Sequence, residues 1–555
     1  PPPPPPFQAE DGIRDVLGGL VGSEMCIRDR LMTDYIQKVS ITARKAAQAG
    51  DWATVKACAK EIIGRQRDNA EGYFLHGLAE KAANRPEQSI KMFSRALGFD
   101  DRRYDAAVEM AGQYLRLHQY GEAAELLEQY QALLENSPMY LDMAGTIYTN
   151  IGQPEKGWPL YKKANELQPG VPSLQANFAA CNVYVGKIDE AREIYRSLLD
   201  KAPDHQRNHY ELSRLGRAKD SVHVEQMQAV VEAKKLPPEK NIYINYALGK
   251  ELEDLERWDE SFHYYKMAGD AAASVGNYDV QTDIRIIDKI IEVCNADWLD
   301  NDASGADSDQ YDKTPVFIVG LPRSGTTLTE RILTSHSRVE SVGESFFMQI
   351  VLKRVSGIRG PDSMSPGIIE AAAKKDMQRV AKGYMEAIAY RFGDKPLFVE
   401  KLPENFLYLG FIAKAFPDAR IIHLNRNPMD NCFALYKQSF FRYAYRLDDL
   451  GPYYAAYARL RDHWRQLLGE RLVEMDYEQL VSDQERQTRR LLDEIGLDFE
   501  ADCLRFEKNR TASNTASSVQ IREKIHVRSV NRWRCYEQHL KPLQTYMEKA
   551  GIRVA

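Results

Sequence analysis

The hydrophobic and polar positions follow two different patterns in the two halves of this 555-residue chain. Between residues 33 and 272, small and large apolar side chains recur with a period of 34 residues. From residue 314 onward, short apolar runs alternate with helical stretches. The first pattern predicts stacked pairs of helices, and the second predicts a parallel sheet with helices on both faces.

Columns of small residues define the repeat in the first half. The first column holds Ala43, Gly77, Ala111, Gly145 and Ala179. A second small residue follows twelve positions later, and a larger apolar one such as Phe93 or Tyr161 four positions after that. Glycine occupies the turn between the two helices at Gly50, Gly152 and Gly186. Small residues let two helices approach closely, so that stacking buries a continuous core.

These five copies in register resemble the tetratricopeptide repeat, and a further copy is visible at Gly249, Ser261 and Tyr265. The resemblance implies a protein-binding surface, and a peptide or protein is the expected partner. Repeats of this kind do not reveal which partner they bind.

Composition divides the chain into four predicted segments. Residues 1–31 begin with six prolines and lack the order of a signal peptide. They resemble a translated sequencing-adapter read-through, so we expect Met32 to be the natural start. Residues 33–272 form the predicted solenoid, and residues 273–313 a helical and acidic linker rich in Asp, Ser and Gly. Residues 314–555 form the predicted α/β domain.

Charge and cysteine content exclude several classes of function. A net charge of −6 gives no reason to expect nucleic acid or an anionic membrane as partner. No run of 18 apolar residues predicts a transmembrane helix. The seven cysteines are scattered without a CxxC pair, which argues against a disulfide framework or a zinc site and for a reducing compartment. We therefore expect a cytoplasmic protein.

The stretch PVFIVGLPRSGTT, residues 315–327, carries the clearest chemistry. An apolar strand, a glycine-bounded turn and a helix start form an anion site, because the turn N–H groups and the helix dipole face the bound charge. The spacing of Gly320 and Gly325 nearly repeats the phosphate loop of NTPases, but Thr326 replaces the expected lysine. The positive charge lies inside the loop, at Arg323. The loop is suited to a phosphate rather than a triphosphate, although it could also be only a tight strand–helix connection.

The run PRSGTT after an apolar strand resembles the 5′-phosphosulfate loop of sulfotransferases, which use the sulfate donor PAPS. The resemblance covers essentially residues 314 to 545. The motifs of this region follow an order similar to that in tyrosylprotein sulfotransferases. Together with the repeats, the chain resembles a bacterial-type tetratricopeptide-repeat sulfotransferase. The resemblance implies that five loop residues hold the 5′-phosphosulfate of the donor: Arg323, Ser324, Gly325, Thr326 and Thr327.

Two residues match catalytic groups of these relatives. Sulfuryl transfer to a hydroxyl needs a base, and a carboxylate serves when burial raises its pKa. Glu344, in a Gly-Glu pair after a short apolar run, matches that base; a helix cap or a solvated carboxylate is the alternative. Lys401, after the strand at 397–399, matches a lysine that stabilises charge on the leaving oxygen, with a surface lysine as the alternative. The resemblance also gives Arg323 a catalytic role.

Further positions match nucleotide contacts. Arg426 ends the strand at 420–424, and its fork of donors suits the 3′-phosphate of PAPS. The family's second 3′-phosphate contact is here Ala434, so Ser439 replaces it or that hydrogen bond is lost. Tyr477 matches a tyrosine that helps hold the nucleotide. The late loop that closes over the donor is matched by Ser517, Ser518, Gln520, Arg522 and Trp533. Lys524 replaces a proline there, which predicts a looser lid.

We expect an α + α/β protein, with a tetratricopeptide solenoid followed by a P-loop-like parallel-sheet sulfotransferase domain. Its expected reaction moves a sulfuryl group from PAPS to a hydroxyl, including a protein tyrosine, or to an amine, without a metal. The repeats would recruit the acceptor or a partner. Two alternatives stay open: a P-loop nucleotide kinase or NTPase, and a catalytically inactive repeat scaffold. The missing loop lysine weighs against the first, and the joint presence of the matched catalytic residues against the second. The sequence does not choose among a protein tyrosine, a saccharide and a small phenol as acceptor.

Overall fold

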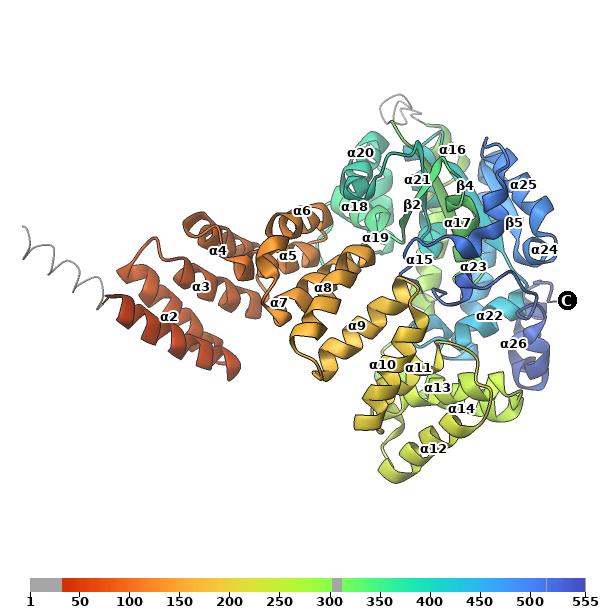
Figure 1. Cartoon of the computed structure of the whole chain (residues 1–555). Helices are drawn as coiled ribbons and strands as arrows, with labels where there is room; N and C mark the ends of the chain where they lie inside the picture. Colours follow the sequence, from red (N-terminus) through yellow and green to blue (C-terminus); the bar gives the residue numbers. More distant parts are fainter. Residues whose placement is uncertain (1–31, 302–311, 516, 555) are drawn as a thin grey trace, which may run out of the picture. The chain divides into compact units, whose positions relative to one another are not determined.

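The computed structural model describes residues 32–301, 312–515 and 517–554, which divide into two compact units with a boundary between Asn136 and Ser137. We describe each unit by itself (Figure 1). The predicted fold class is confirmed, because helical repeats are followed by a five-stranded parallel α/β domain. Residues 1–31 and most of the acidic part of segment 273–313 lie outside the described residues. The four segment boundaries stay predictions.

The first unit consists of helical pairs. Residues 32–48 are helical, and the following elements are α2 (Trp52–Arg65), α3 (Ala70–Ala82), α4 (Pro86–Phe99), α5 (Tyr104–Arg116), α6 (Tyr120–Tyr130) and η1 (Gln131–Leu134). The small-residue column lies where helices cross: Ala43 and Ala111 are fully buried. A Cβ added to Gly77 would lie 2.5 Å from the ring of Phe93, so only glycine permits that approach.

The second unit begins with the remaining repeats. Their helices are α7 (Pro138–Asn150), α8 (Pro154–Leu167), α9 (Pro172–Tyr184), α10 (Ile188–Lys201), α11 (Gln206–Ser213), α12 (Val222–Lys234), α13 (Ile242–Asp254) and α14 (Trp258–Val275). The same close approach recurs here. A Cβ on Gly145 would lie 3.0 Å from the Tyr161 ring, and one on Gly249 would lie 2.7 Å from the Tyr265 ring. The further copy predicted around Gly249 is therefore a true repeat.

The turn inside six of the helical pairs contains a residue with left-handed backbone, whereas the turn between α11 and α12 does not. The positions are Gly50, Asn84, His118, Gly152, Gly186 and Glu256. The sequence pattern revealed only the three glycines. The other three side chains adopt a conformation that costs roughly 1 kcal/mol, which the packing of the surrounding helices offsets.

The α/β domain of the second unit is built on five parallel strands in the order β2-β3-β1-β4-β5. The strands are β1 (Thr314–Gly320), β2 (Val339–Gly343), β3 (Leu397–Glu400), β4 (Arg420–Asn425) and β5 (Leu472–Asp476). Each coincides with an apolar run of the sequence. Side chains alternate between the two faces: Val316 and Ile318 pack towards Leu491 and Leu492, whereas Phe317 contacts Tyr384 and Phe416.

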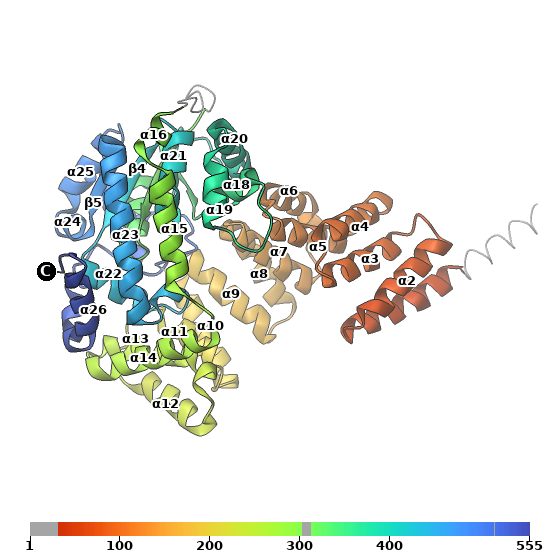
Figure 2. The ribbon, with the colours of Figure 1, turned by 180° about the vertical axis from the view of Figure 1, so that it is seen from behind.

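Helices cover both faces of this sheet (Figure 2). On the Val316 face lie α17 (Thr326–Thr334), α24 (Tyr477–Ser482), α25 (Gln484–Glu494) and η8 (Ala501–Lys508). The Phe317 side and its surroundings hold α15 (Val280–Val293), α16 (Ala296–Asp300), α18 (Phe347–Ser356), α19 (Pro366–Ala373), α20 (Met377–Ile388), η4 (Ala389–Arg391), α21 (Leu409–Ala415) and α23 (Leu447–Leu468). Helix α15, from the predicted linker, runs along α23 and contacts α19. No helix of the described ranges is long and apolar enough to cross a membrane.

The last repeats pack directly on the α/β domain within the second unit. They contact α22 (Pro428–Tyr436), η10 (Arg532–Tyr536) and α26 (Glu537–Lys549). The Phe262 ring of α14 stacks on His539 with centroids 4.4 Å apart and on Tyr436 at 5.8 Å. Tyr265 meets Phe433 edge-on at 6.4 Å. These repeats and the sheet domain therefore share one core.

Candidate active site

The candidate residues gather because each follows a strand of the same parallel sheet. The ends of β1 to β5 are followed, in chain order, by the loop 320–325, Glu344, Lys401, Arg426 and Tyr477. Since parallel strands end at one edge of the sheet and β1 is central, these groups surround the loop. The loop, Glu344, Lys401, Arg426 and Tyr477, which the sequence singled out, therefore lie at this edge, whereas the residues of the late loop follow no strand.

The loop after β1 needs its two glycines. A Cβ on Gly320 would lie 2.7 Å from the Leu424 carbonyl oxygen, and one on Gly325 would lie 2.6 Å from the Tyr477 ring. Between them Arg323 adopts left-handed backbone, with φ of 68°. Arg426 Nη1 donates to the Arg323 carbonyl at 2.6 Å and holds that conformation. Thr326 and Thr327 then begin α17 and are buried, so the helix N-terminus points its free N–H groups into the loop.

Two arginines place positive charge in this loop. Burial and the neighbouring Arg426 lower the pKa of Arg323 to about 10. In the described part of the chain, no carboxylate forms an ion pair with either guanidinium. The Nε atoms of both arginines and the Ser324 hydroxyl are buried without a hydrogen-bond partner. Buried polar groups are rarely left unpaired, so the arrangement fits a bound anion of high charge.

Tyr477 supports the second arginine. The Arg426 guanidinium carbon lies 4.8 Å from the centroid of the Tyr477 ring. The Tyr477 hydroxyl is 3.0 Å from the Ser529 hydroxyl, and Arg426 Nη2 donates to the Ser529 carbonyl at 2.8 Å. Sequence reasoning missed Ser529, which no motif marks.

Only some of the late-loop residues predicted to bind the donor contact the phosphate loop. Arg323 donates to the Ser517 hydroxyl at 2.6 Å and to Gln520 Oε1 at 3.1 Å. Ser518 instead bonds the Ser513 carbonyl at 2.6 Å and shapes the late loop itself. Arg522 is not brought to the phosphate loop: it donates to the Tyr184 carbonyl of α9 at 3.0 Å.

Three further positions singled out in the sequence lie away from the loop cations. Ser439 is 3.0 Å from the Tyr210 hydroxyl of α11, which occupies its side chain. Trp533 is buried, and its backbone N–H donates to Asp430 Oδ1 at 2.9 Å. Ala434 lies on α22. Whether another side chain replaces the family serine at that position stays open.

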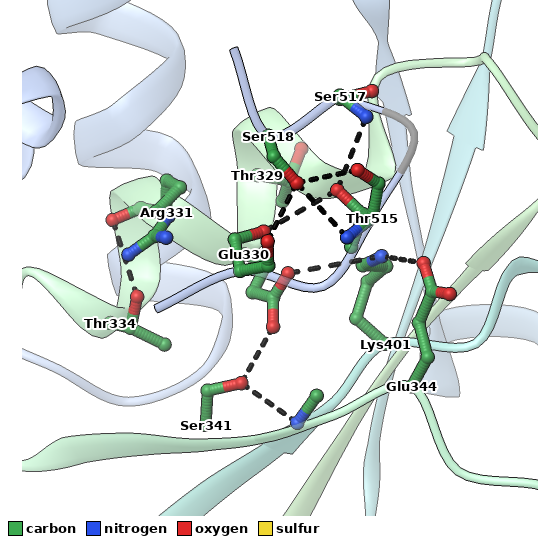
Figure 3. A network of polar contacts seen from close by, with 12 residues as sticks. Thr329, Glu330, Arg331, Thr334, Ser341, Glu344, Lys401, Thr515, Ser517 and Ser518 are labelled. Atoms are coloured by element: carbon green, nitrogen blue, oxygen red, sulfur yellow. Dashed lines mark hydrogen bonds and ion pairs between the residues drawn. The ribbon is translucent and has the colours of Figure 1, made fainter. Parts of the chain in front are cut away.

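Glu344 and Lys401, which follow the neighbouring strands β2 and β3, form an ion pair (Figure 3). Lys401 is fully buried, whereas the Glu344 side chain is 35% exposed. Glu330 Oε2 lies 3.9 Å from the lysine nitrogen on the other side. Burial disfavours the ammonium, but Glu344 and Glu330 outweigh it and raise the pKa of Lys401. The lysine is therefore a permanent cation, and the surface-lysine alternative does not hold.

Glu330 is an acidic neighbour that sequence reasoning missed, and Glu400 is the acidic residue directly before Lys401. Glu330, on α17, accepts a hydrogen bond from Ser341 at 2.6 Å, so its carboxylate is fixed beside Lys401. Glu400 accepts from Ser345 at 2.9 Å, and burial raises the pKa of Glu400 to about 8. Glu400 precedes Lys401 but points to the opposite face of β3. A group of three His, Cys, Asp or Glu side chains able to hold a metal is absent from the described residues.

Comparison with known proteins assigns the residues that form this site to a family. Residues 315–501 fit the family model described as the sulfotransferase family. The α/β region is a sulfotransferase-family domain. The match begins with β1 and continues through β5 and α25, so it includes the loop, Glu344, Lys401, Arg426 and Tyr477.

The relatives of this chain are distant. An uncharacterized protein of Aquifex aeolicus (strain VF5) is 27% identical over 420 residues, covering 74% of this chain and 54% of that protein. A protein-tyrosine sulfotransferase of Drosophila melanogaster is 22% identical over 231 residues, covering 39% and 46%. The chain thus spans about half the length of these two relatives.

Solved structures are similar to separate parts of the chain. The sulfotransferase domain from the curacin biosynthetic pathway is 17% identical, with a TM-score of 0.32, and covers 44% of this chain and 99% of that domain. The tetratricopeptide-repeat protein YrrB is 18% identical, with a TM-score of 0.28, and covers 38% and 97%.

Proposed function

We propose that this protein transfers a sulfuryl group from PAPS to a hydroxyl or amine of an acceptor. The observation that carries the proposal is the pair of arginines at the loop, whose buried Nε atoms and neighbouring Ser324 hydroxyl lack partners. PAPS supplies the sulfuryl group and carries a 5′-phosphosulfate and a 3′-phosphate. Arg323, Ser324 and the first N–H groups of α17 would bind the former, and Arg426, stacked on Tyr477, the latter.

Glu344 is the proposed base. One of its carboxylate oxygens pairs with Lys401, and the partly exposed side chain leaves the other oxygen to accept the acceptor's proton. Lys401 keeps its charge in a buried position, where a fixed cation stabilises negative charge that develops as the donor is cleaved. The roles of Ser517 and Arg522 in donor binding are weaker proposals, because their side chains bond Arg323 and the Tyr184 carbonyl, respectively.

The nucleotide kinase or NTPase is the second candidate. It rests on the phosphate-loop spacing alone, and Thr326 at the lysine position disfavours it. The inactive scaffold is disfavoured by the preserved Glu344–Lys401 ion pair. Protein tyrosine belongs among the proposed acceptors because a relative carries that activity in its name. A peptide or protein partner for the repeats and a cytoplasmic location likewise stay proposals.

Donor binding is tested by calorimetry with PAP, the bisphosphate product, and with AMP. Loss of a charge-assisted bidentate contact costs about 2–3 kcal/mol, so PAP should bind tens- to a hundredfold more tightly than AMP. Arg426→Ala should erase most of this preference. Arg420→Ala, at the exposed opposite end of β4, is the matched control and should keep it. Equal affinity of the unmutated protein for PAP and AMP would refute the assignment.

Catalysis is tested by Glu344→Gln, which preserves shape and removes the base. Transfer of label from radioactive PAPS to a fractionated lysate should fall by roughly 10²–10⁴-fold while PAP affinity stays unchanged. Glu340→Gln, on the strand β2 that precedes Glu344, is the control and should retain transfer, because Glu340 pairs with Lys313 at 2.9 Å. Identification of the labelled species then reveals the acceptor. Full activity of Glu344→Gln would return that residue to a structural role.

A further inference from the structure

Two turns of the repeats lie against loops of the active site within the second unit. The first is the turn between α7 and α8. Arg391 Nη2 donates to the Gly152 carbonyl at 2.8 Å, and the Tyr390 hydroxyl donates to the Ile151 carbonyl at 2.7 Å. Gln153 returns a longer bond to the Tyr390 carbonyl at 3.4 Å. The segment after α20 is thus attached to a repeat turn.

Arg391 fills the space between two glycines of different domains. A Cβ on Gly152 would lie 2.5 Å from Arg391 Nη1, and a Cβ on Gly343 would lie 3.0 Å from Nη2. Gly343 directly precedes Glu344, and its carbonyl accepts the Lys401 N–H at 3.0 Å. The arginine therefore sits against the residue from which both proposed catalytic side chains are positioned. No described carboxylate pairs with it, so packing and the Gly152 carbonyl account for its placement.

The second turn, between α9 and α10, makes the corresponding contact with the late loop. Arg522 Nη2 and the Ser513 N–H both donate to the Tyr184 carbonyl, at 3.0 Å and 2.9 Å. A Cβ on Gly186 would lie 2.5 Å from Arg522 Nη1. The same late loop carries Ser517, which bonds Arg323 of the phosphate loop. One turn is thus connected to the base and the next turn to the donor loop.

We propose that Arg391 and Arg522 are positioning residues through which two successive repeat turns hold the Gly343–Glu344 segment and the late loop in place. The repeat pattern already requires glycine at these two turns. The same glycines leave space for the guanidinium groups, because a Cβ at either position would displace the arginine. The repeats are then part of the active-site scaffold as well as a surface for partners. The catalytic consequences rest on the proposed sulfuryl transfer, whereas the positioning itself does not.

The chain contains its own controls. Gly152→Ala and Gly186→Ala each combine backbone strain, at φ of 80° and 85°, with displacement of an arginine. Gly50→Ala has the same strain at the equivalent turn, where φ is 75° and no atom lies within 4 Å of the added Cβ. Gly170→Ala, with φ of 90° and equally open space, is a second control inside the second unit.

The four full-length variants are compared by hydrogen exchange and by calorimetry with PAP. Gly152→Ala should speed exchange of amides 343–346 about tenfold, and Gly186→Ala should do so for amides 513–515 and 517–520. PAP affinity should fall about tenfold in Gly186→Ala only, because of the two turns only the one between α9 and α10 connects, through the late loop, to Arg323. Gly152→Ala should instead lower transfer from labelled PAPS with unchanged PAP affinity. In Gly50→Ala and Gly170→Ala, the amide exchange rates of both segments should equal those of the unmutated protein.

Arg391→Ala and Arg522→Ala separate positioning from damage to the turns. Each removes the guanidinium without straining the repeat, and each should reproduce the exchange change of its glycine partner. Equal effects in all four glycine variants, or unchanged exchange in the arginine variants, would overturn the inference. Failure of the unmutated protein to bind PAP would refute the proposed function instead, and the exchange comparison would still decide the positioning.

Discussion

Equivalent positions of two repeats, one in each unit, have different neighbours. In the first unit the Ser89 hydroxyl bonds the Gly77 carbonyl at 2.8 Å, and in the second unit Ser261 bonds Gly249 at 2.7 Å. Ser261, however, also lies 3.0 Å from the hydroxyl of Tyr536 in the sulfotransferase domain. The internal geometry of the repeat is thus the same in both copies, and in the later copy Ser261 also contacts the α/β domain.

Buried carboxylates show the same contrast. Glu80 in the first unit pairs with Lys56 at 2.6 Å and with Arg85, both from the repeats themselves. Burial opposes the charge, but these partners lower the pKa of Glu80 to about 2. Glu253 in the second unit takes its partners from the sulfotransferase domain.

Lys437 Nζ lies 2.8 Å and 2.9 Å from the two Glu253 oxygens, and Arg532 Nε lies 3.3 Å from one of them. Burial opposes the charge of Glu253, and Lys437 and then Arg532 outweigh it and lower its pKa. A repeat sequence therefore specifies how its two helices pack, but not which surface covers the pair. We expect the first unit's repeats to recruit a partner, because the last repeats of the second unit pack on the α/β domain.

The largest effect should follow removal of all the repeats. A variant lacking residues 1–275 loses Phe262 and Tyr265 and exposes the rings of Tyr436, Phe433 and Tyr536. Burying each large apolar side chain is worth about 1.5–3 kcal/mol, so several such losses equal the whole stability of a typical domain, about 5–15 kcal/mol. We expect no folded product, measured by circular dichroism and PAP binding. A folded variant with normal PAP affinity would show that the shared core is dispensable.

A smaller effect should come from neutralising one buried carboxylate. Glu253→Gln leaves Lys437 and Arg532 without a counter-charge in a largely buried site, which costs about 3–5 kcal/mol. When unfolding in urea is monitored by the loss of PAP binding, the midpoint of the transition should shift to a lower urea concentration. Glu80→Gln in the first unit is the matched control, and the PAP-linked transition should not move. An equal shift in both variants would mean that the two units unfold together.

Much of the fold was predictable because its signals are local. All five strands follow apolar runs, and Glu344 and Lys401 could be paired in advance because parallel strands end at one edge. Contacts across long sequence separations could not be predicted. Arg522 belongs to a loop whose neighbours bond Arg323, yet its partner is Tyr184, 338 positions away. The roles of Ser529 and Glu330 likewise depend on register between distant segments, which no spacing in one sequence specifies.

The smallest effect should follow removal of the first unit alone. Every contact that builds the candidate site comes from residues 137–555, so a variant lacking residues 1–136 should bind PAP within about twofold of the full chain. If the first unit recruits the acceptor, it holds the acceptor near the site at an effective concentration of about millimolar. The Michaelis constant for the native acceptor should then rise while kcat and PAP affinity stay unchanged. An unaltered Michaelis constant would assign these repeats to assembly or localisation, and a fall in PAP affinity would show that the first unit contributes to donor binding.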